Sequence, residues 1–240
     1  MWTSTELASE HRPYAGVVWR LVEAQHRIST NRLTTDLAQQ AQLEMLADAV
    51  KPRLPDSARH LDYLLASPFR YGHGSESRFR RAHERPGIFY ASEAEATAIA
   101  EAAYWRLRFF TRSPGFQPPR STTEYSSFSV KVASDRAIDL TEPPLARDEA
   151  LWRHASDYAA CQDLAARARE ADTQIVRALS VRDRAGRCNV VLLDPAAFAQ
   201  RSPRAGKTWH LRMEDGSLTA MAAFPSPERF VFAAADFGLA

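Results

Sequence analysis

Residues 69–101 read FRYGHGSESRFRRAHERPGIFYASEAEATAIAE and bring several kinds of reactive side chain close together in the chain. An Arg-Tyr pair (Arg70, Tyr71) opens the stretch, an arginine-rich loop follows, and an aromatic run ends at Tyr90. The stretch closes on a helical pattern with one carboxylate in its middle, Glu101. Arginine forks bind phosphate oxygens, flat rings stack on one another, and a carboxylate stabilises a neighbouring positive charge. These residue types together predict a ligand cleft.

Turn and capping residues in this stretch predict a strand followed by a helix. Pro86-Gly87 is typical of a turn and leads into a strand over 88–90. Ser92 and Glu95 match the S-x-x-E capping box, so we expect a helix that starts at Ser92 and ends before 113–115. Helical spacing gives this helix a buried face made of Ala96, Ile99, Ala103, Leu107 and Phe110.

Upstream of this stretch, the sequence predicts an N-terminal extension. We expect a strand over 16–24, for which a helix is the alternative, and a helix over 36–50 capped by Thr34 or Thr35. Lys51-Pro52 ends that helix, and a short helical piece lies near 61–65. This pattern predicts an extension of strand plus helix, residues 1–60, packed on a main domain of residues 61–240.

Downstream, short strands and helices are mixed. We expect a loop over 114–127, strands near 128–132 and 137–140, and a helical region over 147–170 in two pieces that meet near Ala155-Ser156. A hairpin over 174–182 and 189–194 and further antiparallel strands follow. Without repeated βαβ units, this pattern indicates an α+β fold.

Composition excludes several classes of protein. The 240 residues carry 31 basic and 29 acidic side chains, a near balance that disfavours a dedicated nucleic-acid binder. The cluster Arg78–Arg85 keeps a nucleic-acid-binding module open as an alternative hypothesis. Two cysteines cannot form a disulfide framework, and neither a signal peptide nor a membrane span is visible, so we expect a cytoplasmic protein.

Glu101 is the sharpest single candidate for chemistry. It falls opposite the apolar face of the predicted helix, near small residues and Trp105, and this is typical of a helix face that lines a cleft. Periodicity alone favours a solvated surface glutamate as the alternative interpretation. A carboxylate at this place could accept a sugar hydroxyl and stabilise an oxocarbenium-like transition state.

Other candidates surround Glu101 in the sequence. Tyr90 ends the predicted strand, where its ring could stack on a ligand ring, and Arg70 in a glycine-flanked turn could hold a phosphate. Arg78 or Arg80 could do the same, whereas His73 and His83 are interpreted as surface histidines. The GK[ST], GxSxG and HExxH patterns are missing, so nucleotide hydrolysis on a P-loop, serine hydrolysis and zinc catalysis have no support.

At these residues the sequence resembles the RES-domain family, the toxin partners of bacterial toxin–antitoxin pairs with Xre-like antitoxins. The resemblance covers about residues 61–194 and depends on the order and spacing of five weak motifs. These are Arg70-Tyr71, Ser77-Arg78-Phe79, Tyr90-Ala91-Ser92, Glu101 in TAIAE, and Ser180-Val181-Arg182 with Gly186 and Asn189. The SRFRR stretch departs from the common GGRWN form of the family.

The resemblance implies a fold similar to the ADP-ribosylating toxins, with NAD as the substrate in a cleft between small sheets. Arg70 and Arg78 would hold its phosphates, Tyr71 and Tyr90 would orient nicotinamide and its ribose, and Glu101 would hold the ribose 2′-hydroxyl. Ser180 would add a hydrogen bond in the cleft, and no metal would be needed.

The resemblance also implies partners. ADP-ribose would go to a protein acceptor, the outcome that we expect, or to phosphate or water. An Xre-like antitoxin would occlude the NAD cleft, and nucleic acid would be contacted only through that antitoxin.

Overall fold

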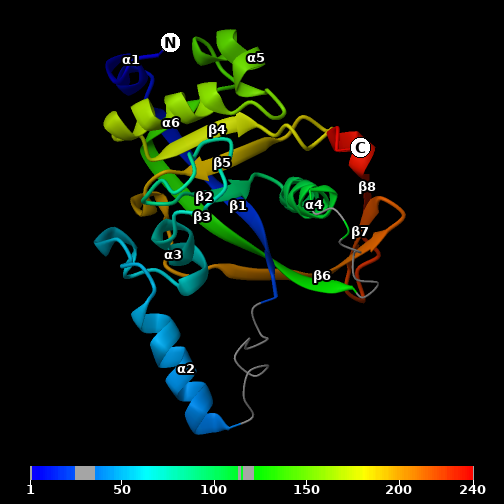
Figure 1. Ribbon diagram of the computed structural model, residues 1–240. Helices are drawn as coiled ribbons and strands as arrows, with labels where there is room; N and C mark the ends of the chain where they lie inside the picture. The colour runs from blue at the N-terminus through cyan, green and yellow to red at the C-terminus, as the bar shows by residue number, and fades with distance from the viewer. Residues whose placement is uncertain (1, 25–35, 113–114, 116–121, 240) are drawn as a thin grey trace.

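The computed structural model describes residues 2–24, 36–112, 115 and 122–239 (Figure 1). Its strands form one eight-stranded sheet in the order β1-β2-β5-β4-β3-β6-β7-β8. The strands are β1 (Arg12–Glu23), β2 (Phe89–Ser92), β3 (Thr123–Asp139), β4 (Ile175–Leu179), β5 (Cys188–Leu192), β6 (Arg204–Glu214), β7 (Ser217–Ala222) and β8 (Arg229–Ala233).

The first five strands of this order close into a ring. β1 pairs with β2 on one side and with β3 on the other, in register from Ala15↔Ala133 to Glu23↔Tyr125. Only the β3–β4 pairing within the ring is parallel. β3 is long enough to leave the ring and pair with β6, which carries β7 and β8 as an antiparallel extension.

Helices cover the ring and its extension. The α-helices are α1 (Ser4–Ser9), α2 (Leu37–Ala49), α3 (Tyr63–Arg70), α4 (Glu95–Thr111), α5 (Glu149–Trp152) and α6 (Ala159–Glu170). α4 lies between the ring and the β7–β8 side of the extension, and α6 lies with α1 and α5 over the β4–β5 side (Figure 1). α2 projects away from the sheet (Figure 1), with Leu46 and Val50 exposed.

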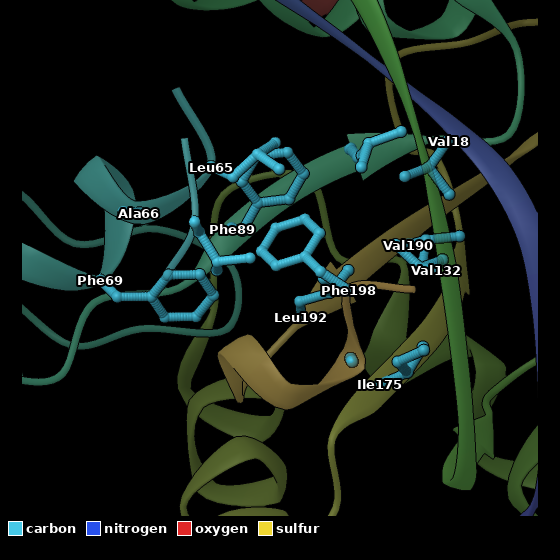
Figure 2. Close-up of a cluster of buried hydrophobic side chains, with 14 of the residues drawn as sticks. Val18, Leu65, Ala66, Phe69, Phe89, Val132, Ile175, Val190, Leu192 and Phe198 are labelled. Carbon is cyan, nitrogen blue, oxygen red and sulfur yellow. The ribbon is translucent and has the colours of Figure 1, made fainter. Parts of the chain in front are cut away.

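Apolar side chains fill the ring. Figure 2 shows Val18, Val132 and Val190 converging with the aromatic rings of Phe89 and Phe198. Phe198 packs edge-on against Phe89, with ring centroids 5.0 Å apart, and Phe69 of α3 packs edge-on against Phe198 at 6.2 Å. A second apolar cluster lies under α6, and a third joins Ile99, Ala103 and Leu107 of α4 to the extension. These three α4 residues belong to the face that the sequence predicted.

The predicted capping box at Ser92 is wrong. Ser92 is still part of β2, the N-cap of α4 is Ala94 without a side-chain cap, and the helix begins at Glu95. The Glu95 carboxylate instead accepts hydrogen bonds from Ser127 Oγ (2.6 Å), Trp209 Nε1 (3.0 Å) and Lys207 Nζ (3.0 Å). Side chains on β3 and β6 therefore bond the Glu95 carboxylate, which the local pattern assigned to the helix cap.

The loop predicted over 114–127 is wrong at residues 123–127, and the strand predicted over 137–140 is not a separate element. Thr123–Asp139 form the single strand β3, because β1 and β6 supply hydrogen-bonding partners along it. Residues 116–121 lie outside the described part of the chain.

Other predicted elements are confirmed. β1 covers most of the strand expected over 16–24, and β4 and β5 form the expected hairpin. The helical region breaks between Trp152 and Ala159, and the C-terminal strands are antiparallel. The α+β class is confirmed, whereas the likeness to ADP-ribosylating toxins remains a proposal.

The N-terminal segment contains the helix predicted there, as α2. Thr34 and Thr35, its expected caps, lie outside the described residues, and Asp36 Oδ1 accepts bonds from the amides of Ala38 (2.8 Å) and Gln39 (3.3 Å). The division at residue 60 stays a prediction, and β1 is hydrogen-bonded into the ring. Within the described residues, no helix has the length and apolar character needed to cross a membrane.

Candidate active site

A cavity of about 370 Å³ lies beside the ring, within the size range of small-molecule sites. Its walls come from the end of β1, from β2 and β5, from one face of α4, and from the loop that precedes β2. The segment after β4 closes the far end. Glu101, Tyr90 and Arg78, three of the residues expected at a site, all line it.

Glu101 is held by two donors from the β4–β5 hairpin. Its Oε1 accepts a hydrogen bond from Ser180 Oγ at 2.7 Å and another from Asn189 Nδ2 at 2.6 Å. Among the residues that the structure describes, none bonds Oε2. One carboxylate oxygen is thus fixed, and the other remains for a ligand in the cavity.

Ser180 is itself fixed by the turn that follows β4. It is buried, and its Oγ accepts hydrogen bonds from the backbone N–H groups of Arg182 and Asp183, both at 3.1 Å. The hydroxyl proton is therefore directed at Glu101. The structure brings Ser180 and Glu101 together, although 79 positions separate them in the chain.

Tyr90 ties the loop before β2 to the cavity wall. Its hydroxyl accepts a hydrogen bond from the Phe79 backbone N–H at 3.0 Å and lies 2.9 Å from Ser77 Oγ. Burial raises the pKa of Tyr90 to about 12, because a phenolate there would lose its hydration. The ring of Tyr90 is therefore a neutral surface of the cavity at physiological pH.

This shift makes the fold sensitive to alkaline pH. An unfolded tyrosine ionises near pH 10, so between pH 10 and about 12 the unfolded state loses a proton that native Tyr90 keeps. The stability due to Tyr90 is complete below pH 10 and is lost as the pH rises through 12. We expect denaturant unfolding to show a larger loss of stability from pH 8 to pH 11 for the wild type than for Tyr90→Phe. Equal losses would contradict this role.

Arg78 and Arg80 reach backbone carbonyls rather than open space. Arg78 donates from Nε to Trp152 O (2.8 Å) and from Nη1 to Leu179 O (2.7 Å). Arg80 donates to the carbonyls of His73 and Ser75, among others. Both guanidinium groups hold the loop before β2 in place. Arg81 pairs with Asp163, so these three arginines are bonded to other groups of the same chain.

Arg78→Ala should destabilise the fold. Leaving two partly buried carbonyls without their charged donor costs about 2–4 kcal/mol, which is roughly 5–15 °C in Tm for a chain of this size. Thermal unfolding measures the effect, and Arg153→Ala is the matched control, since its exposed pair with Glu149 contributes about 0–1 kcal/mol. Equal shifts in the two variants would contradict a structural role for Arg78.

Arg70 and Tyr71 do not line the cavity. Arg70 is the last residue of α3 and Tyr71 its C-cap, so the pair lies at the end of a helix and outside the cavity wall. Their assignment to ligand binding therefore has no support from the cavity wall.

Arg20 of β1 lines the cavity instead, and the sequence reasoning missed it. Its Nη1 donates to Tyr90 O at 3.3 Å and its guanidinium lies 4.8 Å from the Phe89 ring centroid. No described carboxylate pairs with it. Burial lowers the pKa of Arg20 to about 10, so it stays charged at neutral pH. A charged guanidinium without an acidic partner at a cavity wall favours an anionic ligand.

A sequence signal for Arg20 existed. Val18 and Val22 contact the apolar cluster inside the ring, and strand alternation puts Arg20 on the same face between them. A cation at an inward-facing strand position is rare unless it has a function.

Aromatic residues and a further arginine form the far end of the cavity. Arg182 is buried, and its guanidinium lies 3.6 Å from the Tyr104 ring centroid and donates to Tyr158 Oη at 3.3 Å. Trp105, one turn beyond Glu101 on α4, is 39% exposed at this end. Within the described residues, no group of three or more His, Cys, Asp or Glu side chains is placed to hold a metal ion.

A family model and a solved structure match this chain. A family model described as the RES domain matches residues 53–214, more than half of the chain. A solved structure, described as the crystal structure of the M. tuberculosis MbcT–MbcA toxin–antitoxin complex, aligns over 87% of this chain and 92% of that one. The two chains are 12% identical, with a TM-score of 0.47. No curated protein matches the sequence.

Proposed function

The chain belongs to the RES-domain family, and on that premise we propose that it is the toxin of a toxin–antitoxin pair and cleaves NAD between nicotinamide and ribose. The observation that carries the proposal is the half-satisfied carboxylate of Glu101 in the cavity. Two donors hold Oε1, and no described group bonds Oε2. A sugar hydroxyl is a suitable ligand for that oxygen.

The chemistry requires few groups from the protein. The C–N bond between ribose C1′ and the ring nitrogen breaks, its electron pair goes to nicotinamide, and nicotinamide leaves neutral. Positive charge develops on the ribose, where a fixed carboxylate that holds the 2′-hydroxyl stabilises it. Glu101 takes this role, and Ser180 keeps its carboxylate in place.

Binding would use the other walls of the cavity. Arg20, with no described acidic partner, holds a phosphate of NAD, and the neutral ring of Tyr90 orients nicotinamide and its ribose. In this proposal Arg20 takes the role that the sequence assigned to Arg70, and Arg78 supports the wall without touching the phosphates.

Nicotinamide release from NAD by the purified protein tests the proposal. We expect multiple turnovers that are lost on substitution of Glu101. Wild-type protein that releases no nicotinamide in the presence of phosphate, water or cell lysate as acceptors would contradict the function.

We propose that ADP-ribose is transferred to a protein, so that the enzyme is an ADP-ribosyltransferase; hydrolysis or phosphorolysis of NAD is the alternative. Incubation with NAD labelled in the adenylate moiety and cell lysate separates these outcomes. A labelled protein band that persists after denaturation supports transfer, whereas label only in ADP-ribose or its phosphate contradicts it.

An inhibitory partner is expected for such an enzyme. We propose that an Xre-like antitoxin covers the cavity and presents an acidic or carboxylate-ended segment to its arginines. NAD should then compete with the antitoxin. Equal affinity of NAD for the free protein and for the complex would rule out direct occlusion and leave the enzyme assignment intact.

The alternative of a nucleic-acid-binding module loses its main support. Arg78 and Arg80 donate to backbone carbonyls and Arg81 pairs with Asp163, so this cluster offers few charges to a phosphate backbone.

A further inference from the structure

An asparagine amide connects the Glu101 carboxylate to a buried serine on β2. Asn189 Nδ2 donates to Glu101 Oε1 at 2.6 Å, and Asn189 Oδ1 accepts from Ser92 Oγ at 2.7 Å. Ser92 is 2% exposed and Asn189 is 9% exposed. The two residues are partners in the β2–β5 register, so neither side chain can move far from the other.

The amide can satisfy both neighbours in only one orientation. An ionised carboxylate accepts hydrogen bonds and cannot donate, so Asn189 must present Nδ2 to Glu101. Its Oδ1 then points at Ser92, which supplies its hydroxyl proton. The reversed amide would place Oδ1 against Oε1, an unfavourable contact of two acceptors away from water.

The two donors to Glu101 are held in different ways. Two backbone N–H groups fix Ser180 Oγ, so its position depends on the turn after β4. The Asn189 amide, by contrast, is anchored on the side away from Glu101 by the hydroxyl of one side chain, Ser92. Removal of the Ser92 hydroxyl therefore releases one donor to Glu101 and leaves the other in place.

We propose that Ser92 and Asn189 are positioning residues, which fix the Glu101 carboxylate so that Oε2 faces the substrate. This inference rests on the proposed function. Both residues line the cavity, but in this proposal they act through Glu101 and not through a contact with NAD. Their contribution should therefore appear in the chemical step and should vanish when Glu101 no longer carries a charge.

The test measures kcat and KM for nicotinamide release by Ser92→Ala, Asn189→Ala and the double variant. A misplaced catalytic group costs on the order of 10- to 100-fold, so we expect this loss in kcat for Asn189→Ala, with KM changed by less than about 2-fold. Ser92→Ala should lose about 5- to 10-fold, and the double variant should be no slower than Asn189→Ala, because Ser92 acts through Asn189.

One variant background and one control variant distinguish a positioning role from a general effect on stability. In Glu101→Gln, addition of Asn189→Ala should change kcat by less than about 2-fold. Ser129→Ala is the matched control, since Ser129 is a buried serine on β3 that does not line the cavity, and its kcat should equal that of the wild type. Thermal unfolding of each variant confirms that it is folded.

The pH profile of Asn189→Asp is a measurement that a purely structural role of Asn189 would leave unchanged. The new carboxylate would lie against Glu101, and two such groups share a proton, which raises the pKa of one of them. The pH profile of kcat should then shift toward acid: activity is retained while the pair holds its proton and is lost as the pH rises.

The outcomes separate the two proposals. Wild-type protein without nicotinamide release overturns the proposed function and the positioning role together. If the wild type is active but the losses of Asn189→Ala and Glu101→Gln are additive, the positioning role alone is overturned. An unshifted pH profile for Asn189→Asp in an active protein has the same consequence.

Discussion

Glu101→Gln is expected to lower the rate of nicotinamide release by at least about 100-fold, or roughly 3 kcal/mol of transition-state stabilisation. Glutamine keeps the size of the side chain and removes the negative charge that stabilises the developing cation on the ribose. KM for NAD should change little, because the ground state needs a hydrogen-bond acceptor more than it needs a charge. Initial rates with purified protein at saturating NAD measure the effect.

Its control is Glu170→Gln, an exposed glutamate of α6 that pairs with Arg167 at the surface. This variant should keep the wild-type rate. A Glu101→Gln protein that remains folded and releases nicotinamide at the wild-type rate would remove Glu101 from the mechanism.

Arg20→Gln is expected to lower kcat/KM for NAD about 30- to 150-fold, mainly through KM, because a charge-assisted bond to phosphate contributes about 2–3 kcal/mol. Stability should not fall with activity. Arg20 is a desolvated cation without a described acidic partner, and its replacement by a neutral side chain removes an unfavourable burial of charge. Steady-state kinetics and thermal unfolding of the same preparation check both halves of this prediction.

Arg70→Gln is the matched control for Arg20→Gln. Arg70 ends α3 and does not line the cavity, so kcat/KM should change less than about 3-fold. The opposite ranking, with a large loss at Arg70 and none at Arg20, would restore the assignment that sequence spacing suggested.

Local patterns in the sequence predicted elements that depend on local interactions. Alternating apolar residues and a turn predicted the β4–β5 hairpin, and helical spacing predicted the apolar face of α4. The start of α4 could not be predicted in this way, because the S-x-x-E pattern competes with tertiary partners. Ser92 bonds Asn189, and Glu95 bonds groups on β3 and β6.

The site could be predicted in part for the same reason. Tyr90, Glu101 and Ser180 belong to short motifs with recognisable spacing, and the structure places Glu101 and Ser180 in hydrogen-bonding contact. Arg20 lies 70 positions before the carbonyl that it bonds, with α2 and α3 between them in the chain. A local sequence pattern cannot connect residues so far apart. The phosphate-binding role was therefore predicted for Arg70, which lies in the same stretch as Tyr90 and Glu101.

The closed ring of strands has a consequence for biosynthesis. The donors to Glu101 are encoded 79 and 88 positions after it, on the last hairpin needed to complete the ring. A nascent chain that has exposed α4 but not yet Ser180 holds the Glu101 carboxylate without either partner. The donors to Glu101 are therefore synthesised late, and we expect a product terminated before Ser180 to release no nicotinamide from NAD, although it contains Tyr90 and Glu101.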